Sequence, residues 1–300
     1  MIIKKRIKVE NQYSGSNWNF EKTTKYIIED GENLLEAGYF EHYREKDLVK
    51  VAIELPVSYG CPAKCRFCAS SAIKVFHPFE AQLLVELLDY IYEENQADKQ
   101  PYVLLTMTGT GDLTFNFHNV SDFLKQAVQK YNNIHVTLSS CMWNAEYLER
   151  VDELSKDIPI RNIQITYISD REDTLESVVP AYRHRPPNFD EVLTYLSSHP
   201  TKRYFRINYI LIEGVNDSEE DFERFAERIQ TVKDQVCVRI SKLNETMATK
   251  RNHLKTTPIE KLKQFQEKLS SYNIDSYVFY AKNNDNMNCG QLITETELGE

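Results

Sequence analysis

The sequence predicts an α/β fold, a partial (β/α)6 barrel that follows a short N-terminal β-hairpin. After residue 78, segments with helical periodicity alternate with short apolar runs that have the character of strands. Strands separated by helices are typical of βαβ units, which build parallel sheets. Loops rich in Cys or Gly follow the first two strands, at the end of a barrel where ligands bind.

The first 50 residues are expected to precede the barrel. Residues 1–20 are mostly polar and predict a loosely held arm. Two runs rich in Tyr, Ile and Leu, at 24–30 and 34–40, flank Gly31 and predict a hairpin. A third run, at 48–57, ends at a cysteine-rich loop and predicts the strand that opens the barrel.

The barrel is expected over residues 51–282, followed by a tail at 283–300. Helices are predicted at 78–95, 119–131, 145–155, 189–198, 218–233 and 258–272. Strands are predicted at 102–108, 135–140, 162–168, 204–212, 235–243 and 276–281. With the strand before the cysteine loop, the barrel has six or seven strands.

Composition favours a soluble cytoplasmic protein. A chain of 300 residues that is 41% hydrophobic can bury a core as one large domain. It contains neither an apolar run of the roughly 20 residues that span a bilayer nor a signal peptide. Three of its six cysteines are clustered, unlike a secreted disulfide framework. The net charge of -9 leaves nucleic-acid contacts only to local basic patches.

Cys61, Cys65 and Cys68 form a Cys-x3-Cys-x2-Cys loop that can converge on one metal centre. Thiolates hold iron-sulfur clusters, and three of them on a [4Fe-4S] cluster leave one iron free to bind a small molecule. This spacing is the signature of radical-SAM enzymes, which bind S-adenosylmethionine at that iron, and the aromatic Phe67 is typical too. The alternative is a zinc site with His77 as the fourth ligand.

A second motif, at residues 108–112, reads Thr-Gly-Thr-Gly-Asp and follows the predicted strand at 102–108. Two glycines let a backbone approach a ligand closely, although such a pair alone is more often a plain turn. Its place after the cysteine loop matches the glycine-rich segment with which radical-SAM enzymes bind the amino group of S-adenosylmethionine.

A third motif, Cys-Gly-Gln-Leu at residues 289–292, resembles the hallmark of the RlmN and Cfr family of radical-SAM methyl synthases. This family methylates an adenine ring carbon in ribosomal RNA. The resemblance extends to the hairpin at 30–37, the cysteine loop at 57–68, the segment at 109–112 and the strand at 136–140.

The resemblance implies a site for S-adenosylmethionine and a methyl carrier. The residues implied in cofactor binding are Phe67, Gly109, Thr110, Gly111, Asp112, Ser139, Thr166 and Asn244. Cys289 would accept a methyl group from one S-adenosylmethionine and deliver it, after radical activation by a second, to an sp2 carbon of a nucleobase or related heteroaromatic. A flavodoxin or ferredoxin would supply electrons one at a time.

Two departures from the family leave the substrate and the last steps open. The family has a cysteine seven residues before Cys61, where this chain has Glu54. Glu54 could act as the base that removes a proton, or it could pair with a nearby Lys or Arg. Cys141 would then be the thiol that resolves the adduct on Cys289. The family's N-terminal RNA-binding domain has no counterpart, so the substrate could be RNA or a small heteroaromatic molecule.

Two other functions remain open from the sequence. One is a radical-SAM enzyme that catalyses a dehydrogenation, rearrangement or insertion on a small molecule. The other is a non-catalytic interaction protein stabilised by a metal.

Overall fold

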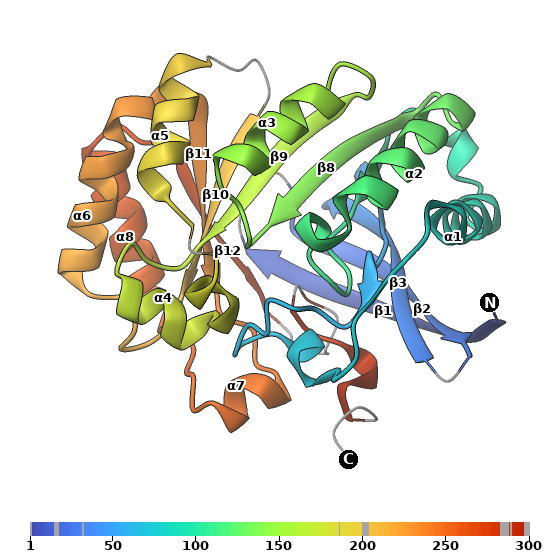
Figure 1. Ribbon diagram of the computed structural model, residues 1–300, viewed down its shortest axis with the longest axis horizontal. Coiled ribbons are helices and arrows are strands. Elements are labelled where there is room, and N and C mark those ends of the chain that lie inside the picture. Colours follow the sequence, from blue (N-terminus) through green and yellow to red (C-terminus); the bar gives the residue numbers. More distant parts are fainter. Residues whose placement is uncertain are drawn as a thin grey trace.

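The computed structural model describes residues 2–14, 18–31, 33–185, 187–199, 204–282, 288 and 290–296. Their strands close into one barrel in the order β1-β12-β11-β10-β9-β8-β7-β4-β3-β2. Helices surround the parallel part of this barrel on the outside (Figure 1). The predicted α/β barrel is therefore confirmed.

Seven strands form the parallel part. They are β4 (Asp47–Glu54), β7 (Val103–Thr106), β8 (Ile134–Ser140), β9 (Ile160–Tyr167), β10 (Tyr204–Leu211), β11 (Val236–Lys242) and β12 (Ser276–Ala281). Each pairs in parallel with its neighbour, so all their C-terminal ends lie at one rim. The cysteine loop and the glycine-rich segment follow β4 and β7 and thus meet at that rim.

Three antiparallel strands close the gap between β4 and β12. They are β1 (Ile2–Ser14), β2 (Phe20–Asp30) and β3 (Asn33–Arg44). The predicted hairpin around Gly31 is confirmed as β2 and β3, but the loosely held arm is wrong, because residues 2–14 form β1. Asn11 and Tyr13 are buried while Glu10 and Gln12 are exposed, the period-two pattern of a half-buried strand. Its many lysines obscure this pattern in the sequence.

Six helices match the predicted ones to within a few residues. They are α1 (Ala81–Glu94), α2 (Phe117–Lys130), α3 (Ala145–Leu154), α5 (Phe189–Ser198), α6 (Glu219–Ile229) and α8 (Ile259–Ser271). Ser218 caps α6 in a reciprocal capping box with Asp221, as its place before three acids indicates.

Four short elements at the rim were not predicted. The helices α4 (Glu172–Val178) and α7 (Met247–Arg251) flank the cysteine loop, and β5 (Ser58–Tyr59) pairs with β6 (His77–Pro78) across its base. In the described part of the chain, no helix is both long and apolar enough to cross a membrane.

Candidate active site

The cysteine loop is held in shape by backbone contacts. Gly60 has φ +70°, and an added Cβ would lie 2.1 Å from the carbonyl oxygen of Val75, so no other residue fits. The N–H of Arg66 donates to Val178 O at the end of α4 (2.9 Å). Cys61, Cys65 and Cys68 line one cavity at the rim.

Three cysteine thiols that line one cavity are a donor set for an iron-sulfur cluster. Within the described ranges, no three His, Cys, Asp or Glu side chains are placed to hold a metal ion. His77 is exposed on β6 and is not among the residues that line the cysteine cavity. Burial, followed by the neighbouring Cys65, raises the pKa of Cys61, and a bound metal would offset this by favouring the thiolate.

The glycines of the second motif allow close packing against the chain before the cysteine loop. An added Cβ at Gly109 would lie 2.8 Å from Pro56 N and 2.9 Å from Leu55 O. Gly111 has φ +99°, and a Cβ there would lie 2.2 Å from Ser58 Oγ. The sequence predicts that these glycines let the backbone approach a ligand. In the structure Gly109 packs against the backbone of Leu55 and Pro56, and Gly111 packs against the side chains of Val57 and Ser58. Both glycines also line the cysteine cavity.

Asp112 joins the glycine-rich segment to the end of β8. Its carboxylate accepts hydrogen bonds from the N–H and Oγ1 of Thr114 (3.0 and 2.8 Å), from Ser140 Oγ (2.8 Å) and from the N–H of Cys141 (2.7 Å). This buried carboxylate therefore fixes the β7 and β8 loops relative to each other. Its predicted contact with S-adenosylmethionine stays a prediction.

The other residues predicted to bind the cofactor line two adjoining cavities. One is the cysteine cavity at the rim, and the other is an interior cavity enclosed by the barrel strands. Gly109, Gly111, Asp112 and Thr166 line the cysteine cavity, Asn244 lines the interior cavity, and Phe67 and Ser139 line both. Thr110 is buried behind them, where its carbonyl accepts the N–H of Val57 (2.9 Å).

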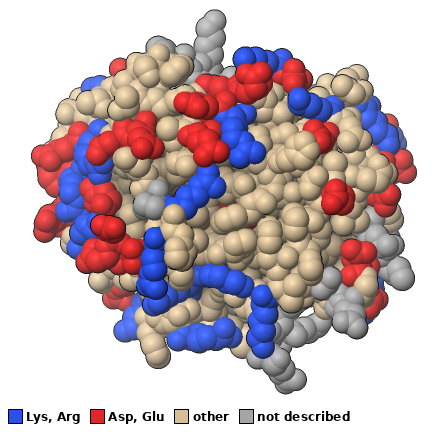
Figure 2. All heavy atoms as spheres, viewed as in Figure 1, with Lys and Arg blue, Asp and Glu red and all other residues tan. Residues whose placement is uncertain are grey.

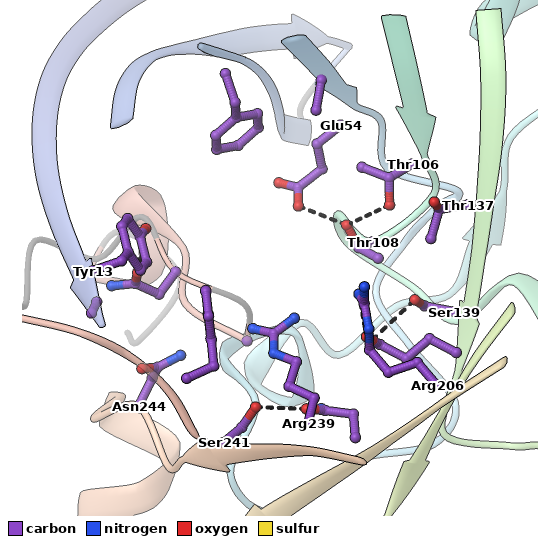
Figure 3. Close-up of a pocket in the computed structure, with 18 of the residues that line it drawn as sticks. Tyr13, Glu54, Thr106, Thr108, Thr137, Ser139, Arg206, Arg239, Ser241 and Asn244 are labelled. Atoms are coloured by element: carbon purple, nitrogen blue, oxygen red, sulfur yellow. Dashed lines mark hydrogen bonds between the residues drawn. The ribbon is translucent and has the colours of Figure 1, made fainter. Parts of the chain in front are cut away.

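Glu54 lines both cavities and forms the ion pair that was the alternative to its role as a base. Its Oε1 lies 2.8 Å from the ammonium of Lys25, and its Oε2 accepts the hydroxyl of Thr108 (2.8 Å). Although burial opposes it, Glu54 and then Glu36 raise the pKa of Lys25. The Lys25 ammonium is therefore held in its charged form beside Glu54. Figure 3 shows Glu54 and Thr108 facing the interior cavity.

Cys141 lies against the cysteine loop. Its Sγ is 3.8 Å from Cys65 Sγ, and its carbonyl accepts the hydroxyl of buried Tyr182. The contact with Cys65, and then burial, raise the pKa of Cys141. Cys289 lies outside the described residues, but its sequence neighbours Asn288 and Gly290 line both cavities. The N–H of Ala69, just after the cysteine loop, donates to Gly290 O (2.8 Å).

The family model of the radical SAM superfamily matches residues 55–229, more than half of the chain. The chain belongs to the radical SAM superfamily. Enzymes of this superfamily use a [4Fe-4S] cluster and S-adenosylmethionine, and the three thiols of the cysteine loop are the donor set for that cluster.

Curated relatives place the chain near the RlmN group of radical SAM methyltransferases. It is 26% identical over 283 residues to the probable dual-specificity RNA methyltransferase RlmN of Pseudothermotoga lettingae, covering 91% of this chain and 76% of the relative. It is 25% identical over 284 residues to the protein of that name from Petrotoga mobilis, covering 93% and 76%. A radical SAM methyltransferase from Sphaerobacter thermophilus has the same fold, with a TM-score of 0.72 at 19% identity over 96% of this chain and 81% of that one. The chain is an RlmN-like radical SAM enzyme.

Sequence reasoning missed the residues that line the barrel interior. Arg206, Asn208 and Ile210 on β10, and Arg239 and Ser241 on β11, all line the interior cavity. A sequence signal for them exists. Strands of a parallel sheet are usually apolar on both faces, whereas in β10 and β11 these residues, most of them polar, alternate with buried apolar ones.

Proposed function

We propose that this radical SAM enzyme methylates an sp2 carbon of a nucleobase or a related heteroaromatic ring, with Cys289 as the methyl carrier. The observation that carries the proposal is the position of the residues on either side of Cys289. Asn288 and Gly290 line the cavity that also contains Cys61, Cys65 and Cys68. Thr294 is anchored as well, because its N–H and hydroxyl both donate to Glu36 Oε1 (2.8 Å each).

The side chains at the rim have separate tasks in this proposal. Cys61, Cys65 and Cys68 would hold the [4Fe-4S] cluster, which would supply one-electron chemistry to S-adenosylmethionine. The segment at 109–112, with Ser139 and Thr166, positions the cofactor. Cys289 holds the methyl group next to the substrate, and Glu54 accepts the proton that leaves the ring carbon.

A basic surface beside the cysteine loop supports an anionic substrate. Although the protein carries a net charge of -9, Figure 2 shows Lys and Arg side chains gathered over the region of α7 and the cysteine loop. Arg66, Lys250 and Arg251 are exposed there, and Asn252 Nδ2 donates to Arg66 O (3.0 Å), which joins the two segments.

Cytoplasmic flavodoxin or ferredoxin is the electron donor we expect.

A second candidate function is a radical reaction that does not release a simple methyl product. The observation that favours it is the Lys25–Glu54 pair, because a carboxylate cannot form the disulfide that the family's cysteine is thought to form. In this case Cys141 would have to resolve the adduct, or the adduct would resolve differently.

Peptide mass spectrometry of Cys289 tests the proposal. Protein reconstituted under anaerobic conditions and incubated with S-adenosylmethionine should gain one methyl group, 14 Da by mass, on the peptide that contains Cys289. Cys237, buried on β11 and absent from both cavity walls, is the internal control and should stay unmodified. An unmodified Cys289 in protein that cleaves S-adenosylmethionine would rule out the methyl carrier and favour the second candidate.

A further inference from the structure

The interior cavity and the cysteine cavity meet at a belt of shared residues, which we call the neck. On the barrel side, the residues that line both cavities and define the neck are Glu54, Thr108, Ser139, Gln164 and Asn208. Figure 3 shows Glu54, Thr108 and Ser139 facing the same space. Asn288 and Gly290 line both cavities as well, so the sequence neighbours of Cys289 lie at the neck.

The interior cavity beyond the neck is enclosed by the barrel itself. All ten strands that close the barrel contribute to its wall. Its volume of about 250 Å³ is close to the lower end of the range for small-molecule pockets. The rings of Tyr13, Trp18 and Phe279 form part of the wall, with 4.8 to 5.8 Å between their centroids. A planar ring packs well against such a surface.

Asn208 brings a hydrogen-bond donor to the neck. The residue is only 5% exposed, and it lines both cavities. The hydroxyl of Ser241 donates to Asn208 Oδ1 (2.6 Å), which orients the amide. Among the described residues, none accepts a hydrogen bond from Asn208 Nδ2. A buried donor without an acceptor costs about 1–3 kcal/mol, so a ligand that accepts from Nδ2 gains affinity.

The amides on the neighbouring strand are engaged within the protein. Gln164 and Asn162 lie on β9, which pairs with the strand of Asn208. Gln164 Nε2 donates to Ser139 Oγ (3.2 Å), and Asn162 Nδ2 donates to Thr137 Oγ1 (3.0 Å). These two amide nitrogens have protein acceptors, whereas Asn208 Nδ2 is left for a ligand.

We infer that Asn208 is a substrate-binding residue that donates a hydrogen bond to a ring nitrogen of a planar heteroaromatic substrate in the interior cavity. This inference rests on the proposed function and narrows its substrate class to rings with an acceptor nitrogen. A nitrogen bound by Asn208 leaves the ring carbon beside it at the neck, where Asn288 and Gly290 also lie. A ring of the same shape without that nitrogen leaves Nδ2 unpaired and binds less tightly.

Benzimidazole and indole are the probes that test this hydrogen bond. They are planar bicyclic rings of the same shape, and benzimidazole has an acceptor nitrogen where indole has a C–H group. Both are titrated by ligand-detected NMR into whole reconstituted protein with S-adenosylmethionine present, at a pH where both rings are neutral. Benzimidazole should bind at least about tenfold more tightly, or about 1.4 kcal/mol, although indole is the more apolar ring. Equal affinities, tighter binding of indole or no binding of benzimidazole would overturn the inference.

Asn208→Leu and Asn132→Leu form a matched pair of variants. Asn132 is exposed at the turn before β8, so Asn132→Leu should keep the wild-type affinity ratio of the two probes. Asn208→Leu should bring this ratio to within about twofold, because the donor is lost. Ser241→Ala keeps Asn208 but removes the hydroxyl that orients its amide, so its ratio should lie between those two values.

The affinity for S-adenosylmethionine separates substrate binding from cofactor binding, since Asn208 also lines the cysteine cavity. It should change by less than about twofold in Asn208→Leu, well under 1 kcal/mol. If it falls about tenfold while the ratio of the two probes is kept, Asn208 serves the cofactor and the inference is wrong.

Competition against bound benzimidazole shows where the ring comes from. Adenosine and an RNA hairpin with an unpaired loop adenosine offer the same ring. Displacement by adenosine and not by the hairpin supports a free small molecule as the substrate, and displacement by both supports a base of RNA. Methylation of Cys289 is measured without substrate, so the proposed function and this inference can fail independently.

Discussion

At the residue scale, a few buried polar groups decide what the cavity can do. Glu54 stands where the RlmN and Cfr family has a cysteine. Its ion pair with Lys25 could not be predicted, because Lys25 is 29 residues away on β2. The pairing exists only because β3 lies between β2 and β4 and brings both side chains to the barrel interior.

Replacing Glu54 separates its proposed role as a base from its role as the counter-charge of Lys25. Glu54→Gln should leave formation of 5'-deoxyadenosine intact but stall product formation, because an amide cannot accept the proton. The free energy of unfolding should fall by about 3 kcal/mol, since Lys25 stays buried without its counter-charge. Chemical denaturation measures the second effect, and Lys25→Met combined with Glu54→Gln should restore most of the stability. Wild-type turnover in Glu54→Gln would remove the assignment as a base.

The ammonium of Lys50 should give the protein a distinct pH dependence. Its pKa is about 8 in the folded chain and 10.5 as the ordinary value, so between these values the unfolded state binds more protons. Stability should therefore rise as the pH increases from about 8 to about 10. Denaturation of Lys50→Met should lack this rise, and an identical rise in both proteins would show that another group causes it. Arg206, Glu21 and Arg239 are the charged groups that act on Lys50.

At the element scale, the loops after β4 and β7 depend on each other. The sequence motif identified the glycine pair, but not its partner, because the contact with residues 55–58 joins segments about 50 residues apart. Regular elements with clear periodicity, such as α5 and β12, have the predicted bounds. The helices α4 and α7 are too short to show a periodic pattern, and the period of β1 is obscured by its charged residues.

Gly109→Ala tests the packing of the two loops. The new Cβ would meet backbone atoms at 2.8 and 2.9 Å, which cannot move aside as a flexible side chain could. We expect a loss of about 2 kcal/mol in stability, typical of overpacking, and an affinity for S-adenosylmethionine that is at least about tenfold weaker. Gly31→Ala is the control, since its φ of +62° is strained but nothing lies within 4 Å. Unchanged cofactor affinity in Gly109→Ala would show that the loop packing does not position the cofactor.

At the scale of the whole molecule, β1 to β3 convert an open parallel sheet into a closed barrel. Without β1, the edges of β2 and β12 would be free to pair with other chains. Deleting residues 1–14 should therefore cause self-association, measurable by light scattering. It should also remove Tyr13 from the cavity wall. A monomeric and fully stable truncated protein would contradict the role of β1 in closing the barrel.

The most direct test of the account follows one hydrogen atom. Protein whose Cys289 carries a trideuterated methyl group, loaded from labelled S-adenosylmethionine, is washed, reduced and given unlabelled S-adenosylmethionine. If the radical takes its hydrogen from the carrier, the 5'-deoxyadenosine contains one deuterium, and Cys289→Ala or Cys61→Ala abolishes the labelled product. 5'-Deoxyadenosine without deuterium from fully loaded protein would contradict the account.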